Sequence, residues 1–130
     1  MQRKVTLLDR ARTDLSVAKT LAESAASDEL HLDVAAYHIQ QAVEKAVKFD
    51  MQMSGIKYNN THDMDLLWNT AANGGVVLPS WIYDNIDILN SYATKTRYGY
   101  DIVSSLRKIS QLVEFAQSYI SALAPVTEDG

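Results

Sequence analysis

Residues 35–53, AAYHIQQAVEKAVKFDMQM, carry the clearest pattern in the chain. Val43 and Val47 widen an apolar face there, so we expect a helix that is buried on more than one side. We place this helix at about 32–54, with Asp33 as its N-cap or as an acid in its first turn and Gly55 as its C-terminal stop signal. The main face steps by three and four residues, the spacing of one side of an α-helix, through Ala35, Ile39, Ala42, Ala46, Phe49 and Met53.

The same period appears on both sides of this stretch. It predicts a helix at about 3–26 and another at about 101–123, which Pro125 ends. The apolar positions of the first helix are Val5, Leu8, Ala11, Leu15, Ala18 and Ala22. Those of the last helix are Ile102, Leu106, Ile109, Val113, Ala116, Ile120 and Leu123. Residues 124–130 follow as a tail with an acidic end, which we expect to fray.

A short helix is expected in the region between these long ones. It passes through Leu67 and Trp68 and ends before Gly74, with Asp63 and Asp65 in its first turn, where the helix dipole favours acids.

Pro79 suits the first position of a further helix at about 79–92. Residues 93–100 are predicted to form a polar, aromatic loop after it. The core contacts of this helix are expected from Trp81, Ile82, Ile86, Leu89 and Tyr92.

No segment alternates in the way a strand does, so the sequence predicts an all-α fold. Short connections favour an antiparallel bundle of four to five helices. We expect one domain over residues 1–130, with its core at about 3–123.

Composition narrows the function classes. The chain has no cysteine, no signal-peptide pattern and no apolar run of membrane-spanning length, so we expect a cytoplasmic protein without a membrane association. The net charge of −4 disfavours a general nucleic-acid binder. Any phosphate contact would then come from a local cluster or from a groove between two subunits.

Motifs for metals and cofactors are missing from the sequence. No glutamate is followed three residues later by histidine, as a di-iron bundle requires, and no phosphate-binding loop is present. The histidines, His31, His38 and His62, are scattered. We therefore expect no metal and no cofactor, and no motif identifies a catalytic residue.

A polar stripe follows one side of the 32–54 helix. It could line a groove, with amides contacting a base and lysines contacting phosphate. The alternative is a solvated flank in which Glu44 and Lys48 form an ordinary i,i+4 pair. The stripe comprises His38, Gln41, Lys45, Lys48 and Gln52.

The 96–101 segment is a second candidate. Arg97 offers a planar fork for phosphate or carboxylate, and Tyr98 offers a stacking face. Asp101 could instead cap the last helix and hold Arg97 structurally. His62, before the short helix, is more typical of a capping or surface residue than of a catalyst.

These residues carry a family resemblance. The run 36–48, AYHIQQAVEKAVK, resembles the second-helix signature of HEPN domains. The Thr61-His62-Asp63 segment and the Tyr92 and Arg97-Tyr98 elements resemble further HEPN motifs, in the same order over about 3–123. The first signature is fairly specific, whereas the others are weak when taken alone.

The resemblance implies a helical bundle that is usually a homodimer and often accompanies a minimal nucleotidyltransferase in toxin–antitoxin or defence systems. Many family members are metal-independent ribonucleases with an arginine followed, four to six residues later, by histidine. Here no histidine follows His62, so neither Arg97 nor Arg107 has that partner.

This departure favours a non-catalytic HEPN module that dimerises, binds a nucleotide and works with a nucleotidyltransferase. The nucleotide-binding residues expected on this hypothesis are His38, Gln41, Lys45, Lys48, Arg97 and Tyr98, with His62, Asp63, Tyr92 and Asp101 as accessory residues. Two alternatives stay open. One is a divergent ribonuclease that uses His38 or His62, and the other is a pure protein-assembly module.

Overall fold

The structure, a computed structural model, describes residues 4–24, 29–58, 60–97 and 105–123. This part of the chain forms six helices and no strand, so the predicted all-α bundle is confirmed. The helices are α1 (Leu7–Ser24), α2 (Glu29–Met53), α3 (Met64–Asn73), α4 (Ser80–Asp84), α5 (Ile86–Arg97) and α6 (Leu106–Leu123).

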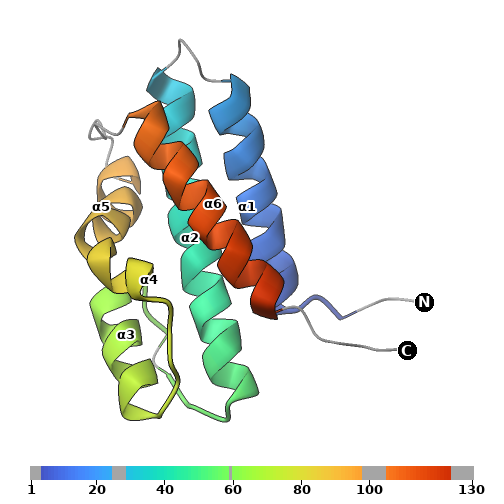
Figure 1. The fold of residues 1–130 in the computed structure, drawn as a ribbon, viewed down its shortest axis with the longest axis vertical. Helices are drawn as coiled ribbons and strands as arrows, with labels where there is room; N and C mark the ends of the chain where they lie inside the picture. The colour runs from blue at the N-terminus through green and yellow to red at the C-terminus, as the bar shows by residue number, and fades with distance from the viewer. Residues whose placement is uncertain (1–3, 25–28, 59, 98–104, 124–130) are drawn as a thin grey trace.

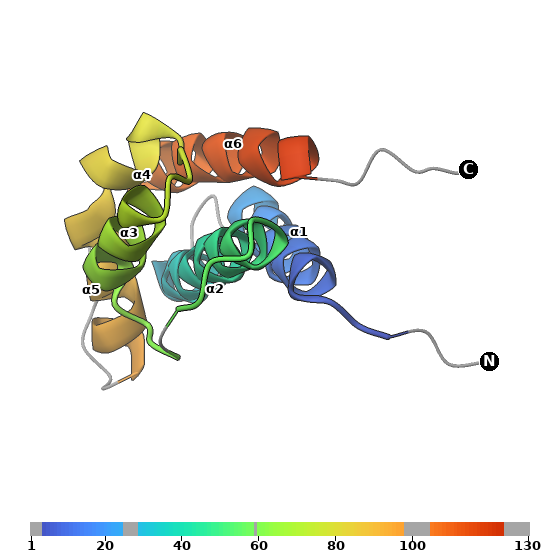
Figure 2. The same cartoon turned by 90° about the horizontal axis from the view of Figure 1, so that it is seen from below.

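Helix α2 lies at the centre of the bundle and contacts α1, α3, α5 and α6 (Figure 1). α1 and α5 run in the opposite direction to α2, whereas α6 runs in the same direction and crosses the α1–α2 pair. Figure 2 shows α6 on one side of this pair and α3, α4 and α5 along its edge. The other side of the pair carries no helix, and this uncovered side of α2 is called the outer face below.

The core follows the predicted seams with exceptions at their ends. Val5 and Met53 are exposed, because Val5 precedes α1 and Met53 is the last residue of α2. Leu106 is also partly exposed at the start of α6. The largest fully buried side chains are Tyr92, Ile39, Met51, Met64, Leu67, Ile82, Leu89, Ile109 and Leu112.

Local capping explains where the first helices begin. Thr6 and Asp9 form a reciprocal capping box, since Thr6 Oγ1 accepts from the Asp9 amide and Asp9 Oδ2 accepts from the Thr6 amide. α1 therefore begins at Leu7 rather than at residue 3. α2 begins at Glu29, three residues before the predicted start, so Asp33 lies inside the helix and does not cap it.

Gly55 ends α2 as predicted. Its φ of +73° is a left-handed conformation that glycine adopts without a steric penalty. The amides of Gly55 and Ile56 donate to the carbonyls of Gln52 and Met51, the paired bonds of a Schellman motif.

The helix predicted at 79–92 is in fact two helices. Pro79 is the N-cap of α4, and Asn85 separates α4 from α5. Asn85 donates to the carbonyl of Trp81 at 2.7 Å and accepts from Lys108 Nζ at 2.6 Å, so its side chain competes with regular helical bonding.

The predicted loop at 93–100 is also wrong in its first half, because α5 continues to Arg97. Its sequence has no glycine or proline before Gly99, so the helix has no reason to stop where the apolar seam stops. Residues 98–100 lie outside the described part of the chain.

Helix α6 begins at Leu106, later than predicted, with the amide of Lys108 donating to Ser105 Oγ as an N-cap bond. Asp101, the predicted cap, lies outside the described residues.

Tyr119 of α6 donates to Asp50 Oδ2 of α2 at 2.8 Å. Burial of the Tyr119 ring raises its pKa well above the usual value, and the hydrogen bond to Asp50 and the charge of that residue act in the same direction. Tyr119 therefore stays neutral and remains the donor of this hydrogen bond between α6 and α2.

Candidate functional site

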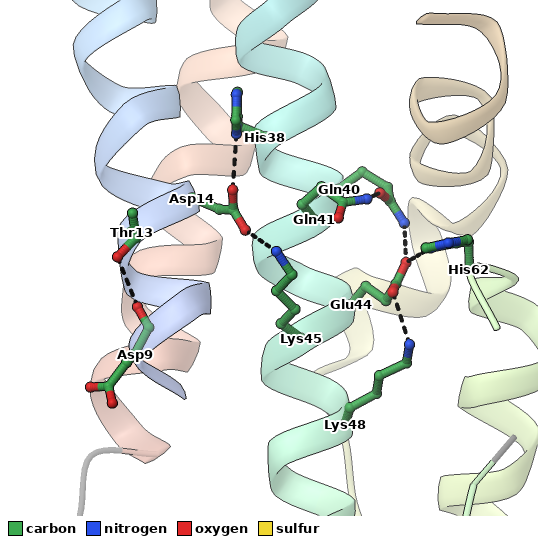
Figure 3. A network of polar contacts seen from close by, with 10 residues as sticks. All are labelled: Asp9, Thr13, Asp14, His38, Gln40, Gln41, Glu44, Lys45, Lys48 and His62. Atoms are coloured by element: carbon green, nitrogen blue, oxygen red, sulfur yellow. Dashed lines mark hydrogen bonds and ion pairs between the residues drawn. The ribbon is translucent and has the colours of Figure 1, made fainter. Parts of the chain in front are cut away.

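The predicted polar stripe lies along the outer face of α2, where it divides into two clusters (Figure 3). One cluster joins α2 to α1, and the other joins α2 to the segment before α3. Gln41 lies between them and is half-buried, whereas Gln52 is exposed near the end of α2.

The first cluster is centred on Asp14 of α1. Its two carboxylate oxygens contact His38 Nδ1 at 2.9 Å and Lys45 Nζ at 2.6 Å. His38 and Lys45 are separated by seven residues, so helical periodicity places both over the same carboxylate. Asp14 thus holds an imidazole and an ammonium side by side at the edge of the outer face.

A pocket of about 400 Å³ opens between α1 and α2 beside this cluster. Its lining combines two cations, two carboxylates and a hydroxyl: Arg10, Lys45, Asp9, Asp14 and Thr13, with Val5 at its edge. Lys45 has three N–H donors and Asp14 accepts one, so the others remain available for an anionic ligand.

The second cluster is centred on Glu44, which is 2% exposed. Glu44 Oε1 accepts from Gln40 Nε2 and from His62 Nδ1, both at 2.9 Å, and Oε2 accepts from Lys48 Nζ at 2.9 Å. Gln41 Nε2 donates in turn to Gln40 Oε1 at 2.7 Å, extending the network to the outer face.

This geometry corrects one interpretation of the stripe. The i,i+4 pair between Glu44 and Lys48 is present, but it is buried rather than solvated, with Lys48 only 6% exposed. The Lys48 ammonium also lies 5.9 Å from the centre of the Tyr58 ring. Lys48 is therefore enclosed and already paired with Glu44.

His62 is neither a helix cap nor an isolated surface residue. Its side chain is 52% exposed, and its Nδ1 lies 2.9 Å from Glu44 Oε1, so the buried carboxylate fixes the orientation of the ring. Asp63 is the N-cap of α3, accepting from the amides of Asp65 and Leu66. Tyr92 is fully buried, so its ring is a core residue in this structure.

The remaining predicted residues are only partly placed. Arg97 is the last residue of α5, but its side chain lies outside what the structure describes, as do Tyr98 and Asp101. The site residues that the sequence did not single out are Asp14, Gln40 and the pocket residues Asp9, Arg10 and Thr13. Asp14 carries no motif and is 24 and 31 residues from its two partners, whereas Gln40 belongs to the buried side of the quoted helix.

Two further findings concern the described ranges as a whole. No helix in them combines the length and apolar character needed to cross a membrane. Nor do their His, Asp and Glu side chains form a group of three or more that could hold a metal ion.

The protein is a helical bundle in which the central helix, α2, packs against α1, α5 and α6 and has a polar outer face. The second-helix signature described above lies in α2. Residues 5–124 match the model of the HEPN domain, and the chain therefore belongs to the HEPN domain family. No curated protein and no solved structure matches the sequence.

Proposed function

We propose that this chain is a non-catalytic HEPN module that forms a homodimer, binds a nucleotide and acts with a minimal nucleotidyltransferase. The observation that carries the binding proposal is the placement of His38 and Lys45 on Asp14, beside the α1–α2 pocket. Lys45 and Arg10 supply donors for phosphate, and Asp9 and Asp14 supply acceptors for ribose hydroxyls.

Gln41, Arg97 and Tyr98 complete the proposed set of nucleotide contacts. Gln41 has an amide at the outer face of α2, available to a base once its bond to Gln40 is exchanged. Arg97 would supply a planar fork and Tyr98 a stacking surface from the end of α5.

Exposed apolar side chains on the outer face support the homodimer. Leu30 and Val34, one turn apart on α2, are 72% and 43% exposed. Exposed apolar positions grouped on one helix face are typical of interaction surfaces. A dimer formed there would bring two copies of each polar cluster close to one interface.

Isothermal titration with ATP, GTP and UTP tests the binding proposal. Lys45→Ala is expected to weaken nucleotide affinity about tenfold or more, since it removes a charge-assisted phosphate contact. Lys57→Ala, at an exposed position outside both clusters, serves as the matched control and should leave the affinity unchanged. A wild-type protein that gives no saturable heat with any of the three nucleotides contradicts the proposal.

The Glu44–His62 pair favours a second candidate, a divergent ribonuclease. An exposed imidazole oriented by a buried carboxylate is a suitable general base, here with Nε2 as the group that would accept the proton of a ribose 2′-hydroxyl.

This candidate predicts cleavage of single-stranded or structured RNA in the presence of EDTA, measured by gel electrophoresis. His62→Ala should abolish cleavage, whereas His31→Ala, an exposed histidine near the start of α2, should not. Absence of cleavage by the wild-type protein, or equal loss in both variants, removes this candidate.

A further inference from the structure

An aromatic surface patch lies on α3 and α4, at the edge of the bundle, and contains no residue of either polar cluster. Trp68 of α3 and Tyr83 of α4 form it, with ring centroids 5.3 Å apart and planes tilted by 49°. Tyr83 is 62% exposed although its ring has an aromatic partner. Val77, in the segment that runs back along α3 towards α4, is 91% exposed (Figures 1 and 2). Trp68 and Tyr83 are called the Trp68–Tyr83 patch below, and Val77 belongs to the segment that joins their two helices.

Side chains of this composition are typical of protein interfaces. Tryptophan and tyrosine are enriched at interface centres, where they contribute large contact areas with little loss of side-chain entropy. Burial of one such ring in a partner gives more affinity than several polar contacts at a rim.

The charged residues that flank the patch in the sequence are acidic, although Lys108 of α6 lies against Asn85, between Asp84 and Asp87. Between Lys57 and Lys95 the sequence contains four aspartates and no lysine or arginine. Asp65 lies one turn before Trp68 on α3, Asp84 directly follows Tyr83, and Asp87 lies one turn further along the chain. None of the four aspartates forms an ion pair within the described ranges.

The negative charge beside the patch favours a cationic partner over an anionic one. Phosphate groups of nucleic acids and of anionic membranes would be repelled by unpaired carboxylates. A cationic group, in contrast, gains from the carboxylates and can also lie over the face of Trp68 or Tyr83. An apolar side chain beside that cation would cover Val77.

We propose that the Trp68–Tyr83 patch docks an amphipathic helix of a partner protein in which lysine or arginine residues flank an aliphatic face. The partner's cations contact Asp84 and Asp87, and its aliphatic residues cover Tyr83 and Val77. This surface does not depend on nucleotide binding, because it shares no residue with the α1–α2 pocket or with the Glu44 network.

A designed probe tests the proposal with the full chain. The probe is an 18-residue peptide of leucine and lysine at helical spacing, and its counterpart replaces every lysine with glutamate. Trp68 becomes the only tryptophan in a Trp81→Phe background, so its fluorescence reports binding at the patch. The substitution keeps an aromatic ring against Phe115, and circular dichroism verifies the fold of each variant.

The lysine peptide is expected to change Trp68 fluorescence saturably, and the glutamate peptide is not. The double variant Asp84→Asn/Asp87→Asn and the single variant Tyr83→Ala should each raise Kd about tenfold. Glu23→Gln/Glu114→Gln removes the same charge from the α1–α6 side and should change Kd by less than about twofold.

Two outcomes overturn the proposal. Equal weakening by both double variants would show that the peptide responds to the net charge of the whole protein rather than to this patch. Sedimentation equilibrium that shows self-association abolished by Tyr83→Ala would assign the patch to a second copy of this chain instead.

Discussion

Glu44→Ala is expected to lower the free energy of unfolding by about 3–5 kcal/mol, because it leaves the Lys48 ammonium buried without its counter-charge. The variant also removes the acceptor for Gln40 and His62, so three donors lose their partner at once. Urea denaturation followed by circular dichroism at 222 nm measures the change.

Two further variants make this result specific. Glu114→Ala removes an exposed glutamate from α6 and should change stability by less than about 0.5 kcal/mol. Glu44→Met/Lys48→Met removes both charges together and should recover much of the loss, since an apolar pair of similar size avoids the desolvation cost. If Glu44→Ala unfolds at the wild-type urea midpoint, the buried network contributes nothing to stability.

Ile39→Ala is expected to cost about 2–5 kcal/mol, the range for removing a large aliphatic side chain from a closed core. Ile39 is completely buried in the middle of α2, the helix that all the long helices contact. Surrounding side chains therefore cannot collapse into the space without moving several helices.

The matched control for this prediction lies on the same helix. Val34→Ala truncates a β-branched residue on the outer face, where the side chain is 43% exposed, and should change stability by less than about 1 kcal/mol. Thermal unfolding monitored by circular dichroism compares the two. Similar melting temperatures for both variants would mean that the inner face of α2 is not tightly packed.

Periodicity predicted the bundle because a helix that covers a core must repeat its apolar residues every three to four positions. Gly55 was equally predictable, since a left-handed C-terminal residue is nearly always glycine. The break at Asn85 was not, because its side chain is held by Lys108, which lies 23 residues later in the chain. The continuation of α5 to Arg97 was missed because that last turn lies beyond the apolar seam.

The candidate site shows the same division between local and distant contacts. The Glu44–Lys48 pair follows from i,i+4 spacing, but its burial depends on His62 and Tyr58, which belong to the segment after α2. Asp14 meets His38 and Lys45 only through the packing of α1 on α2. A single sequence contains no signal for such a contact.

The distribution of aspartates has a consequence for how partners approach. The chain has 16 acidic and 12 basic residues, and four of the acidic ones lie between Lys57 and Lys95, so the remainder of the chain is balanced at 12 and 12. The four aspartates lie at the N-cap and in the first turn of α3, at the end of α4 and in the first turn of α5, so negative charge is concentrated along these short helices. Such a local concentration of negative charge attracts an approaching cationic protein before contact, and it accelerates the encounter most at low ionic strength.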